Sequence, residues 1–220
     1  RLSGTTFAGV YAQMASAYLR EHDATVEDLS RVAVKNHGNG AQNPHAQLGF
    51  ECTLEEAMNA PDVAAPLNLY HCCPTTDGAS AVLVASEAVA AELSEAPVRV
   101  AGVSPDDLDF AEVHDCFAIA ELAAYEDLGF CDRGAAPRLL REGVTDPDGD
   151  LPVNTSGGLK SKGHPLGATG TGQVVEAFAQ LRGDAHVQVD DPEIGVAHNV
   201  GGSGGGVTVH VFERVEEGEL

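Results

Sequence analysis

The chain has 220 residues, of which 43% are apolar, with 25 Gly and 11 Pro, a composition typical of one or two globular domains and not of disordered or collagen-like protein. Its 34 Asp and Glu against 12 Lys and Arg give a formal charge of −22. So acidic a surface repels nucleic acid and anionic membranes, and neither is expected as a partner.

The basic residues include few lysines, namely Lys35, Lys160 and Lys162, and the acidic residues are spread along the chain. Salt screens the self-repulsion of such a chain. The composition therefore predicts a protein adapted to high salt, in the manner of a halophile. The alternative is an ordinary acidic cytoplasmic protein.

The cysteines are five in number and irregularly spaced: Cys52, Cys72, Cys73, Cys116 and Cys131. This pattern does not indicate a disulfide framework, so we expect reduced thiols and a cytoplasmic location. No apolar run is long enough for a membrane helix, and the first residues show no signal-peptide pattern. No Cys-x-x-Cys or His-x-x-x-His pair is present among the nearby His and Cys residues, so no metal site is expected.

Elements of the first part of the chain follow from apolar spacing and turn residues. The spacing predicts an amphipathic helix over residues 8–21 and a helix cap with a first turn over residues 25–29. The Asn-, Gly- and His-rich residues 36–47 predict a loop or a series of turns. Residues 79–86 predict a short buried strand, and residues 86–93 a helix.

The second part alternates between strand-like and helix-like segments. The predicted strands are residues 98–103, 109–113, 194–198 and 206–212, the predicted helices are residues 117–128 and 173–181, and residues 154–172 form a glycine-rich loop. This alternation indicates an α/β fold. No helix connects the strands on either side of residues 102 and 103, although a parallel pair needs a crossover, so we expect residues to be missing there.

The first candidate site is His114-Asp115-Cys116-Phe117, between a short strand and a helix. Ligands gather at the carboxyl ends of strands in open α/β sheets. A thiol at a helix N-terminus has a lowered pKa, which would favour the thiolate of Cys116. The alternative is that Cys116 is a small buried apolar residue, which is the commoner case.

The second candidate is the loop over residues 154–172, which holds two of the three lysines and His164. Its glycines allow the backbone to approach a ligand, and the loop leads into a helix start that can bind an anion. Because Pro165 restricts the residue before it, His164 is a candidate general base. A solvated surface histidine and a dinucleotide-binding turn over residues 167–172 are the alternatives, and the latter lacks a strand directly before it.

The third candidate is His198-Asn199-Val200-Gly201-Gly202, where a predicted strand runs into a flexible glycine turn. The alternative is a turn with an incidental histidine, because dense glycine also permits close backbone packing.

Taken in order, these motifs resemble those of the thiolase family. His-Asp-Cys-Phe is followed by Gly-Gly-x4-Gly-His-Pro-x-Gly-Ala-x-Gly and then by His-Asn-x-Gly-Gly-x-Gly. Residues 36–47 and 73–87 also resemble the archaeal and sterol-carrier-protein-type branch of that family. The resemblance covers nearly the whole chain.

The resemblance implies a layered α/β/α/β/α thiolase fold of two similar halves and a short-chain acyl-CoA C-acyltransferase. Such enzymes condense two acetyl-CoA molecules to acetoacetyl-CoA or catalyse the reverse thiolysis. By resemblance, His164 activates a nucleophilic cysteine and His114 helps to bind the thioester oxygen. Cys116 and His198 are competing candidates for the second acid/base.

No cofactor is expected beyond the CoA thioesters, which are substrates. Lys160 and Lys162 suit the phosphates of CoA, since they offset an otherwise negative surface. The residues expected to contact the substrate are Asn154, Ser156, Gly157, Lys160, Lys162, Gly163, Gly201 and Gly202.

The family nucleophile belongs to the first half of the fold, and none of the five cysteines matches its motif. We therefore expect the chain to hold the later part of a thiolase, with the first, nucleophile-bearing domain ahead of Arg1. The predicted division is residues 1–78 as a loop-domain remnant and the end of the first half, residues 79–103 as the last strand and helix of that half, and residues 104–220 as the C-terminal thiolase domain.

The resemblance also implies partners. We expect a homodimer or homotetramer, and an OB-fold zinc-ribbon protein as a partner that links to the mevalonate route. The alternative function is a non-catalytic thiolase-like subunit that binds acyl-CoA or acts as a scaffold. A Cys-His-Asp hydrolase built on Cys116 is a poor third alternative, because Asp115 is adjacent in sequence and no motif matches.

Overall fold

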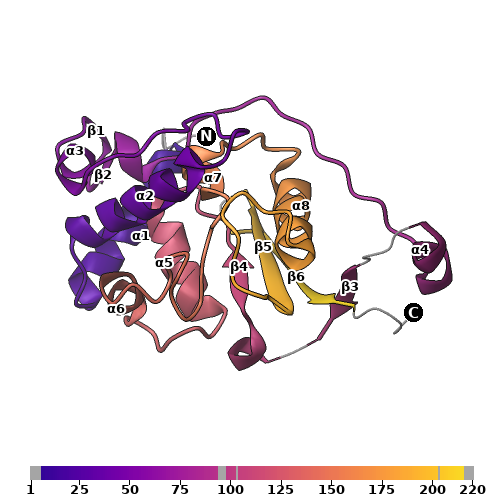
Figure 1. The fold of residues 1–220 in the computed structure, drawn as a ribbon. Helices are drawn as coiled ribbons and strands as arrows, with labels where there is room; N and C mark the ends of the chain where they lie inside the picture. Colours follow the sequence, from indigo (N-terminus) through magenta and orange to yellow (C-terminus); the bar gives the residue numbers. More distant parts are fainter. Residues whose placement is uncertain (1–5, 94–97, 103, 203, 216–220) are drawn as a thin grey trace.

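The computed structural model of the chain describes residues 6–93, 98–102, 104–202 and 204–215. Its first part is mainly helical, as Figure 1 shows. The elements there are α1 (Phe7–Glu21), α2 (Val26–Ala41), α3 (Leu54–Met58), β1 (Asp62–Ala64), β2 (Leu67–Asn68), a 3-10 turn (Leu69–His71) and α4 (Glu87–Leu93).

The second part alternates strands and helices, which confirms the predicted α/β class. Its elements are β3 (Val98–Ala101), a 3-10 turn (Pro105–Asp107), β4 (Phe110–Glu112), α5 (Ala118–Asp127), α6 (Ala136–Arg141), α7 (Gly158–Ser161), α8 (Thr169–Arg182), β5 (Ile194–Gly201) and β6 (Gly206–Arg214).

Most of the predicted elements are confirmed within one or two residues. The cap of α2 is confirmed as well, because the backbone N–H of Thr25 donates to the carboxylate of Asp28 at 2.8 Å. The strand predicted over residues 98–103 ends at Ala101 as β3, and its last residue, Val103, lies outside the described residues.

The loop predicted over residues 36–47 is partly wrong, because α2 continues to Ala41. The polar side chains in its last turns are buried and paired. The side-chain amide of Asn39, for example, donates to the carbonyl of Asn154 at 3.0 Å. Gly40 lies so close to α7 that a Cβ there would be 2.0 Å from Oγ of Ser161.

The four strands β3, β6, β5 and β4 form one sheet in that order. β4 and β5 are parallel, whereas β6 is antiparallel to both β5 and β3. β3 and β4 are therefore not neighbours, and the short connection between them needs no crossover helix. This placement accounts for the connection near residue 102 that the sequence pattern does not explain.

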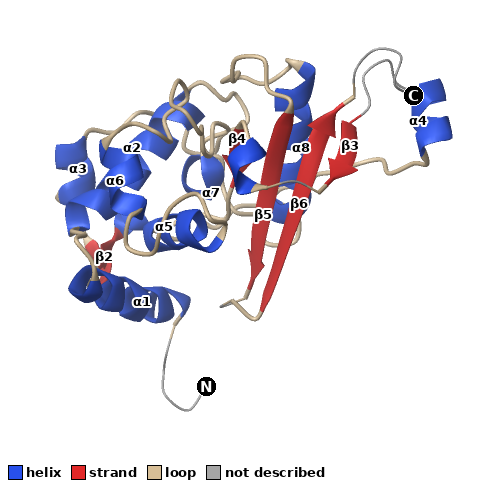
Figure 2. Ribbon diagram, turned by 90° about the horizontal axis from the view of Figure 1, so that it is seen from below, coloured by secondary structure: helices blue, strands red, loops and turns tan. Residues whose placement is uncertain are grey.

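The sheet separates two apolar clusters, because alternate side chains of a strand point to opposite faces. Ala111, Val196 and Val211 pack with the cluster built from α1, α2, α5 and α6. Phe110, Ala197 and Phe212 pack on the other side with residues of α8. The helices of the first group lie together on one side of β5 in Figure 2.

The buried strand predicted over residues 79–86 is wrong. These residues form no strand, and the side chains of Leu83 and Val84 are 78% and 88% exposed. In Figure 1 the chain runs through this segment as a long extended connection to α4. A strand needs a neighbour to satisfy its backbone groups, and the described residues provide none for this segment.

Candidate active site

Two strands bring His114 and His198 together. The parallel pairing of β4 with β5 sets Glu112 beside Ala197, so the residues that follow each strand are neighbours. The backbone N–H of His114 donates to Nδ1 of His198 at 3.4 Å. The side-chain nitrogen of Asn199 lies 3.0 Å from Nδ1 of His114.

His164 joins this pair from the loop before α8. Its ring centre lies 5.0 Å from that of His114, with the rings edge to face. Its backbone N–H donates to Oγ1 of Thr76 at 3.1 Å, and its Nδ1 lies 2.7 Å from Oγ1 of Thr169. The structure thus brings together the three histidines that the sequence singles out.

All three histidines are neutral at pH 7. Burial lowers the pKa of His114 to about 3, with smaller contributions from His164 and His198. Burial also lowers the pKa of His164 and that of His198. A neutral imidazole can accept a proton or donate a hydrogen bond, so each ring is suited to acid/base or oxyanion chemistry.

Cys116 is buried between β4 and α5, and its predicted low pKa is wrong. Burial raises the pKa of the Cys116 thiol to about 11, although a hydrogen bond with Tyr11 acts in the opposite direction. The thiol form therefore dominates at neutral pH. The dipole of the nearby helix does not offset the loss of solvent.

One short segment ties Cys116 to His164. The backbone N–H of Cys73 donates to the carbonyl of Cys116 at 3.0 Å, and Cys72 pairs with Phe117. A few residues later, Thr75 pairs with His164 in a parallel bridge. Residues 72–76 therefore fix both candidate catalytic side chains to one backbone.

Asp115 holds the start of α7, a role that the sequence reasoning missed. Its carboxylate accepts the backbone N–H groups of Leu159 at 2.6 Å and Lys160 at 3.2 Å. It also accepts the side-chain amide of Asn36 at 2.8 Å. The available signal was its place in His-Asp-Cys, directly between two candidate site residues.

Asn154 and Ser156 face the protein interior instead of a ligand. The side chain of Asn154 accepts the backbone N–H of Val113 and donates to Glu121, both at 2.8 Å. The hydroxyl of Ser156 donates to Glu112 at 2.6 Å. Their expected contacts with substrate are corrected in this structure, because their polar atoms already have buried partners.

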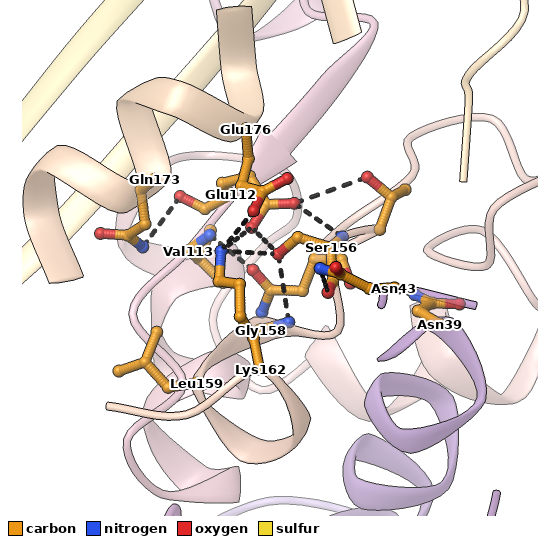
Figure 3. Close-up of polar contacts among 12 residues, drawn as sticks. Asn39, Asn43, Glu112, Val113, Ser156, Gly158, Leu159, Lys162, Gln173 and Glu176 are labelled. Atoms are coloured by element: carbon orange, nitrogen blue, oxygen red, sulfur yellow. Dashed lines mark hydrogen bonds and ion pairs between the residues drawn. The ribbon is translucent and has the colours of Figure 1, made fainter. Parts of the chain in front are cut away.

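Lys160 and Lys162 are likewise engaged within the chain. Lys160 is buried, and its ammonium donates to the carbonyl of His71 at 2.9 Å, so it does not reach a CoA phosphate. Lys162 lies between Glu112 at 4.0 Å and Glu176 at 3.3 Å. Figure 3 shows this cluster, in which the ammonium of Lys162 also donates to the hydroxyl of Ser156.

The glycines divide into two kinds. A Cβ at Gly157 would lie 2.6 Å from Cα of Gly40, and one at Gly163 would lie 2.5 Å from Oγ1 of Thr76, so these two permit close packing. Gly202, in contrast, has a positive φ of 62° and nothing within 4 Å of an added Cβ. Gly201 is exposed beside it. The turn at Gly201 and Gly202 thus keeps open space for a ligand.

Two cavities adjoin the site. One of about 410 Å³ lies between residues 76–80 and residues 165–168, directly after His164. A larger one of about 1160 Å³ lies between residues 81–85, α8 and the sheet. Asn199 and Gln173 line the larger cavity, whereas the three histidines do not.

Comparison with known proteins gives three findings. Residues 79–214 match the family model described as "Thiolase C-terminal domain-like". The acetyl-CoA acetyltransferase of Methanothermobacter thermautotrophicus is 42% identical over 96% of this chain and 64% of its own length, and sterol carrier protein 2 of Bos taurus is 32% identical over 93% and 45%. The solved structure titled "Ltp2-ChsH2(DUF35) aldolase" matches with a TM-score of 0.80 and 25% identity, over 96% of this chain and 64% of that one.

The chain therefore spans less than two thirds of the length of these relatives. The alignment with the Methanothermobacter protein runs over 246 positions, more than the 220 residues of this chain, so the relative has residues within the matched region that this chain lacks. In the part of the chain that the structure describes, no helix is long and apolar enough to cross a membrane. The family match covers more than half of the sequence, and the chain belongs to the thiolase family, with relatives in its archaeal and sterol-carrier-protein branch.

Proposed function

We propose that this chain is part of a short-chain acyl-CoA C-acyltransferase that interconverts two acetyl-CoA molecules and acetoacetyl-CoA plus CoA. The observation that carries the proposal is the meeting of His114, His164 and His198 where β4 and β5 end, with Cys116 tied to His164 through residues 72–76. The methanogen relative named acetyl-CoA acetyltransferase supports the choice of substrate class.

In the thiolysis direction a cysteine thiolate attacks the ketone carbon of acetoacetyl-CoA. The bond between that carbon and the α-carbon then breaks, and the α-carbon takes a proton to give acetyl-CoA. The acetyl group left on the cysteine passes to the thiol of CoA, which gives the second acetyl-CoA. None of the five cysteines here matches the nucleophile motif, so that thiol belongs outside these 220 residues.

The residues of this chain supply the proton transfers. His164 is neutral and is positioned to take the proton of the nucleophilic thiol and later that of CoA. Cys116 holds its proton at neutral pH and is suited to deliver it to the α-carbon. His114 is suited to hydrogen-bond the thioester oxygen as negative charge develops there.

The test is thiolysis of acetoacetyl-CoA by the intact purified protein, with the exposed His186 as the matched control position. His164→Ala should reduce turnover by at least about 100-fold, since it removes the base. His186→Ala should leave turnover unchanged. Thiolysis that survives in the His164→Ala variant would overturn the assignment.

A second candidate is a non-catalytic thiolase-like subunit that binds acyl-CoA or a partner protein. It is favoured by the missing nucleophile motif and by the aldolase structure, whose title names two components. In that case the intact protein would bind acyl-CoA without thiolysis. Its mass would equal that of the 220 residues, whereas the thiolase proposal needs a larger protein or a second chain.

We extend the proposal to assembly. The titles of the relatives are consistent with a thiolase-fold chain that works beside a second protein, and an OB-fold zinc-ribbon protein is the partner that we expect. Co-purification from the native source followed by mass determination tests both this partner and the expected homodimer or homotetramer.

A further inference from the structure

The hydrogen bonds around the three histidines determine which ring nitrogen of each carries the proton. A neutral imidazole has one N–H donor and one acceptor nitrogen, and its role in catalysis depends on which nitrogen is which. The partners of the Nδ1 atoms are therefore informative, because the opposite nitrogen, Nε2, has the complementary character.

Gln173 fixes the orientation of the first network. Its side-chain nitrogen donates to the carbonyl of His198 at 2.9 Å and lies 3.4 Å from the carbonyl of Glu112. Both neighbours are acceptors, so the amide cannot be turned the other way. The oxygen of Gln173 is thereby left to face the side chain of Asn199 at 2.8 Å.

This orientation fixes Asn199 and then His114. The group of Asn199 that faces the Gln173 oxygen must be its NH₂, since two oxygens at 2.8 Å would repel each other. The same NH₂ lies 3.0 Å from Nδ1 of His114. Nδ1 of His114 is therefore the acceptor, and the proton of the neutral ring is on Nε2.

His198 has the same tautomer for a separate reason. Its Nδ1 accepts the backbone N–H of His114, a donor that cannot change its role. The ring proton of His198 is therefore also on Nε2. Both rings offer an N–H group, which suits a developing oxyanion, and neither Nε2 has a lone pair to act as a base.

His164 has the opposite tautomer. The hydroxyl of Thr169 lies 3.0 Å from the carbonyl of Pro165 and 2.7 Å from Nδ1 of His164. A hydroxyl has one proton, and if it pointed to the ring, two oxygens would meet at 3.0 Å without a proton between them. The hydroxyl therefore donates to Pro165 and accepts Nδ1–H of His164, which leaves the lone pair on Nε2.

We propose that Thr169 and the Gln173–Asn199 pair are positioning residues that set these tautomers, so that His164 is a base while His114 and His198 are hydrogen-bond donors. This inference rests on the proposed function for its catalytic meaning, and the tautomers themselves do not depend on turnover. The second acid/base is then Cys116 and not His198.

The test is the ring ¹⁵N spectrum of the full chain labelled at histidine, with each ring assigned by single substitution. Nδ1 should be unprotonated in His114 and His198 and protonated in His164. Thr169→Val should convert His164 to a mixture of tautomers or to Nε2–H and leave His114 unchanged. Thr171→Val, on the same helix, is the matched control and should change none of these rings.

Asn199→Asp should act in the opposite way, because a carboxylate accepts a proton from Nδ1 of His114 and cannot donate one. The His114 Nδ1 signal should move to the protonated position. A protonated Nδ1 on His114 in the unchanged chain, or a Thr169→Val spectrum identical to that of the unchanged chain, would overturn the inference. If the tautomers are as stated but the intact protein shows no thiolysis, the proposed function fails and the tautomer assignment stands.

Discussion

The three histidines of the site differ in chemistry although they are the same residue type. His164 contacts a hydroxyl through Nδ1, whereas Nδ1 of His114 faces an amide nitrogen. These partners come from α8 and β5, far from their histidines in the case of Asn199. The environment of each ring, and not its motif, sets its role.

Substitutions of Cys116 and His198 separate the two candidates for the second acid/base. Cys116→Ala should reduce thiolysis by at least about 100-fold, because the proton donor to the α-carbon is lost. His198→Gln keeps an N–H near the place of Nε2 and should lose less than the roughly 100-fold that removal of an oxyanion donor costs. Turnover numbers of the two variants check this. A larger loss for His198→Gln than for Cys116→Ala would assign the acid/base to His198.

The motifs alone were sufficient to identify His114, Cys116, His164 and His198 as neighbours in one site. They could not show that Lys160 points inward, because a lysine in a glycine loop is normally solvated. Here its ammonium reaches the carbonyl of His71, 89 residues away. Such a long-range partner leaves no trace in local sequence spacing.

At the scale of elements, the short helix α7 is the part that joins the motifs. Its first backbone N–H groups are bound by Asp115, which lies between His114 and Cys116. Two residues after α7 begins the Gly163-His164 pair. The position of His164 therefore depends on the fit between Asp115 and Gly158, the first residue of α7.

Gly158→Ala tests this fit. Gly158 has a φ of +56°, and a Cβ there would lie 2.6 Å from Oδ2 of Asp115. The left-handed backbone costs about 1–2 kcal/mol for a residue other than glycine, and the clash adds to it. Gly183→Ala is the matched control, because Gly183 has a φ of +75° with nothing within 4 Å of the added Cβ.

Denaturant unfolding measures both variants against the unchanged chain. Gly183→Ala should lower the free energy of unfolding by about 1 kcal/mol, and Gly158→Ala should lower it by a clearly larger amount. Equal losses in the two variants would mean that Asp115 yields to the new methyl group and does not hold α7 in place.

Elements with apolar periodicity were predictable, and those that use polar contacts were not. The end of α2 was expected as a loop because Asn36, Asn39 and Gly40 are turn residues in isolation. In the fold the amide of Asn36 donates to Asp115 at 2.8 Å and to Glu121 at 2.7 Å, so a polar helix is buried. Residues 79–86 have a strand pattern but lack a neighbouring strand among the described residues.

At the scale of the whole molecule, the two faces of the sheet pack differently, and this follows from strand alternation. The thiolase C-terminal match begins at residue 79 and crosses the predicted division at residue 103. In the structure β3 pairs with β6, so residues 98–101 join the sheet of the later residues. The division into three regions remains a prediction.

The net charge of −22 predicts a dependence of stability on salt. Raising KCl from about 0.1 M to about 1 M shortens the screening length from about 10 Å to about 3 Å. The melting temperature should then rise by about 4 °C or more, which corresponds to roughly 1–2 kcal/mol for a chain of this size. Thermal unfolding at matched pH checks the shift. A melting temperature that stays constant or falls would count against adaptation to salt.

The measurement that tests the central claim most directly is the formation of acetyl-CoA from acetoacetyl-CoA and CoA by the intact protein, followed in the unchanged protein and in His164→Ala. The account predicts turnover in the unchanged protein and a loss of at least about 100-fold in the variant. Turnover that does not depend on His164, or an intact protein that binds acyl-CoA without forming acetyl-CoA, would contradict it.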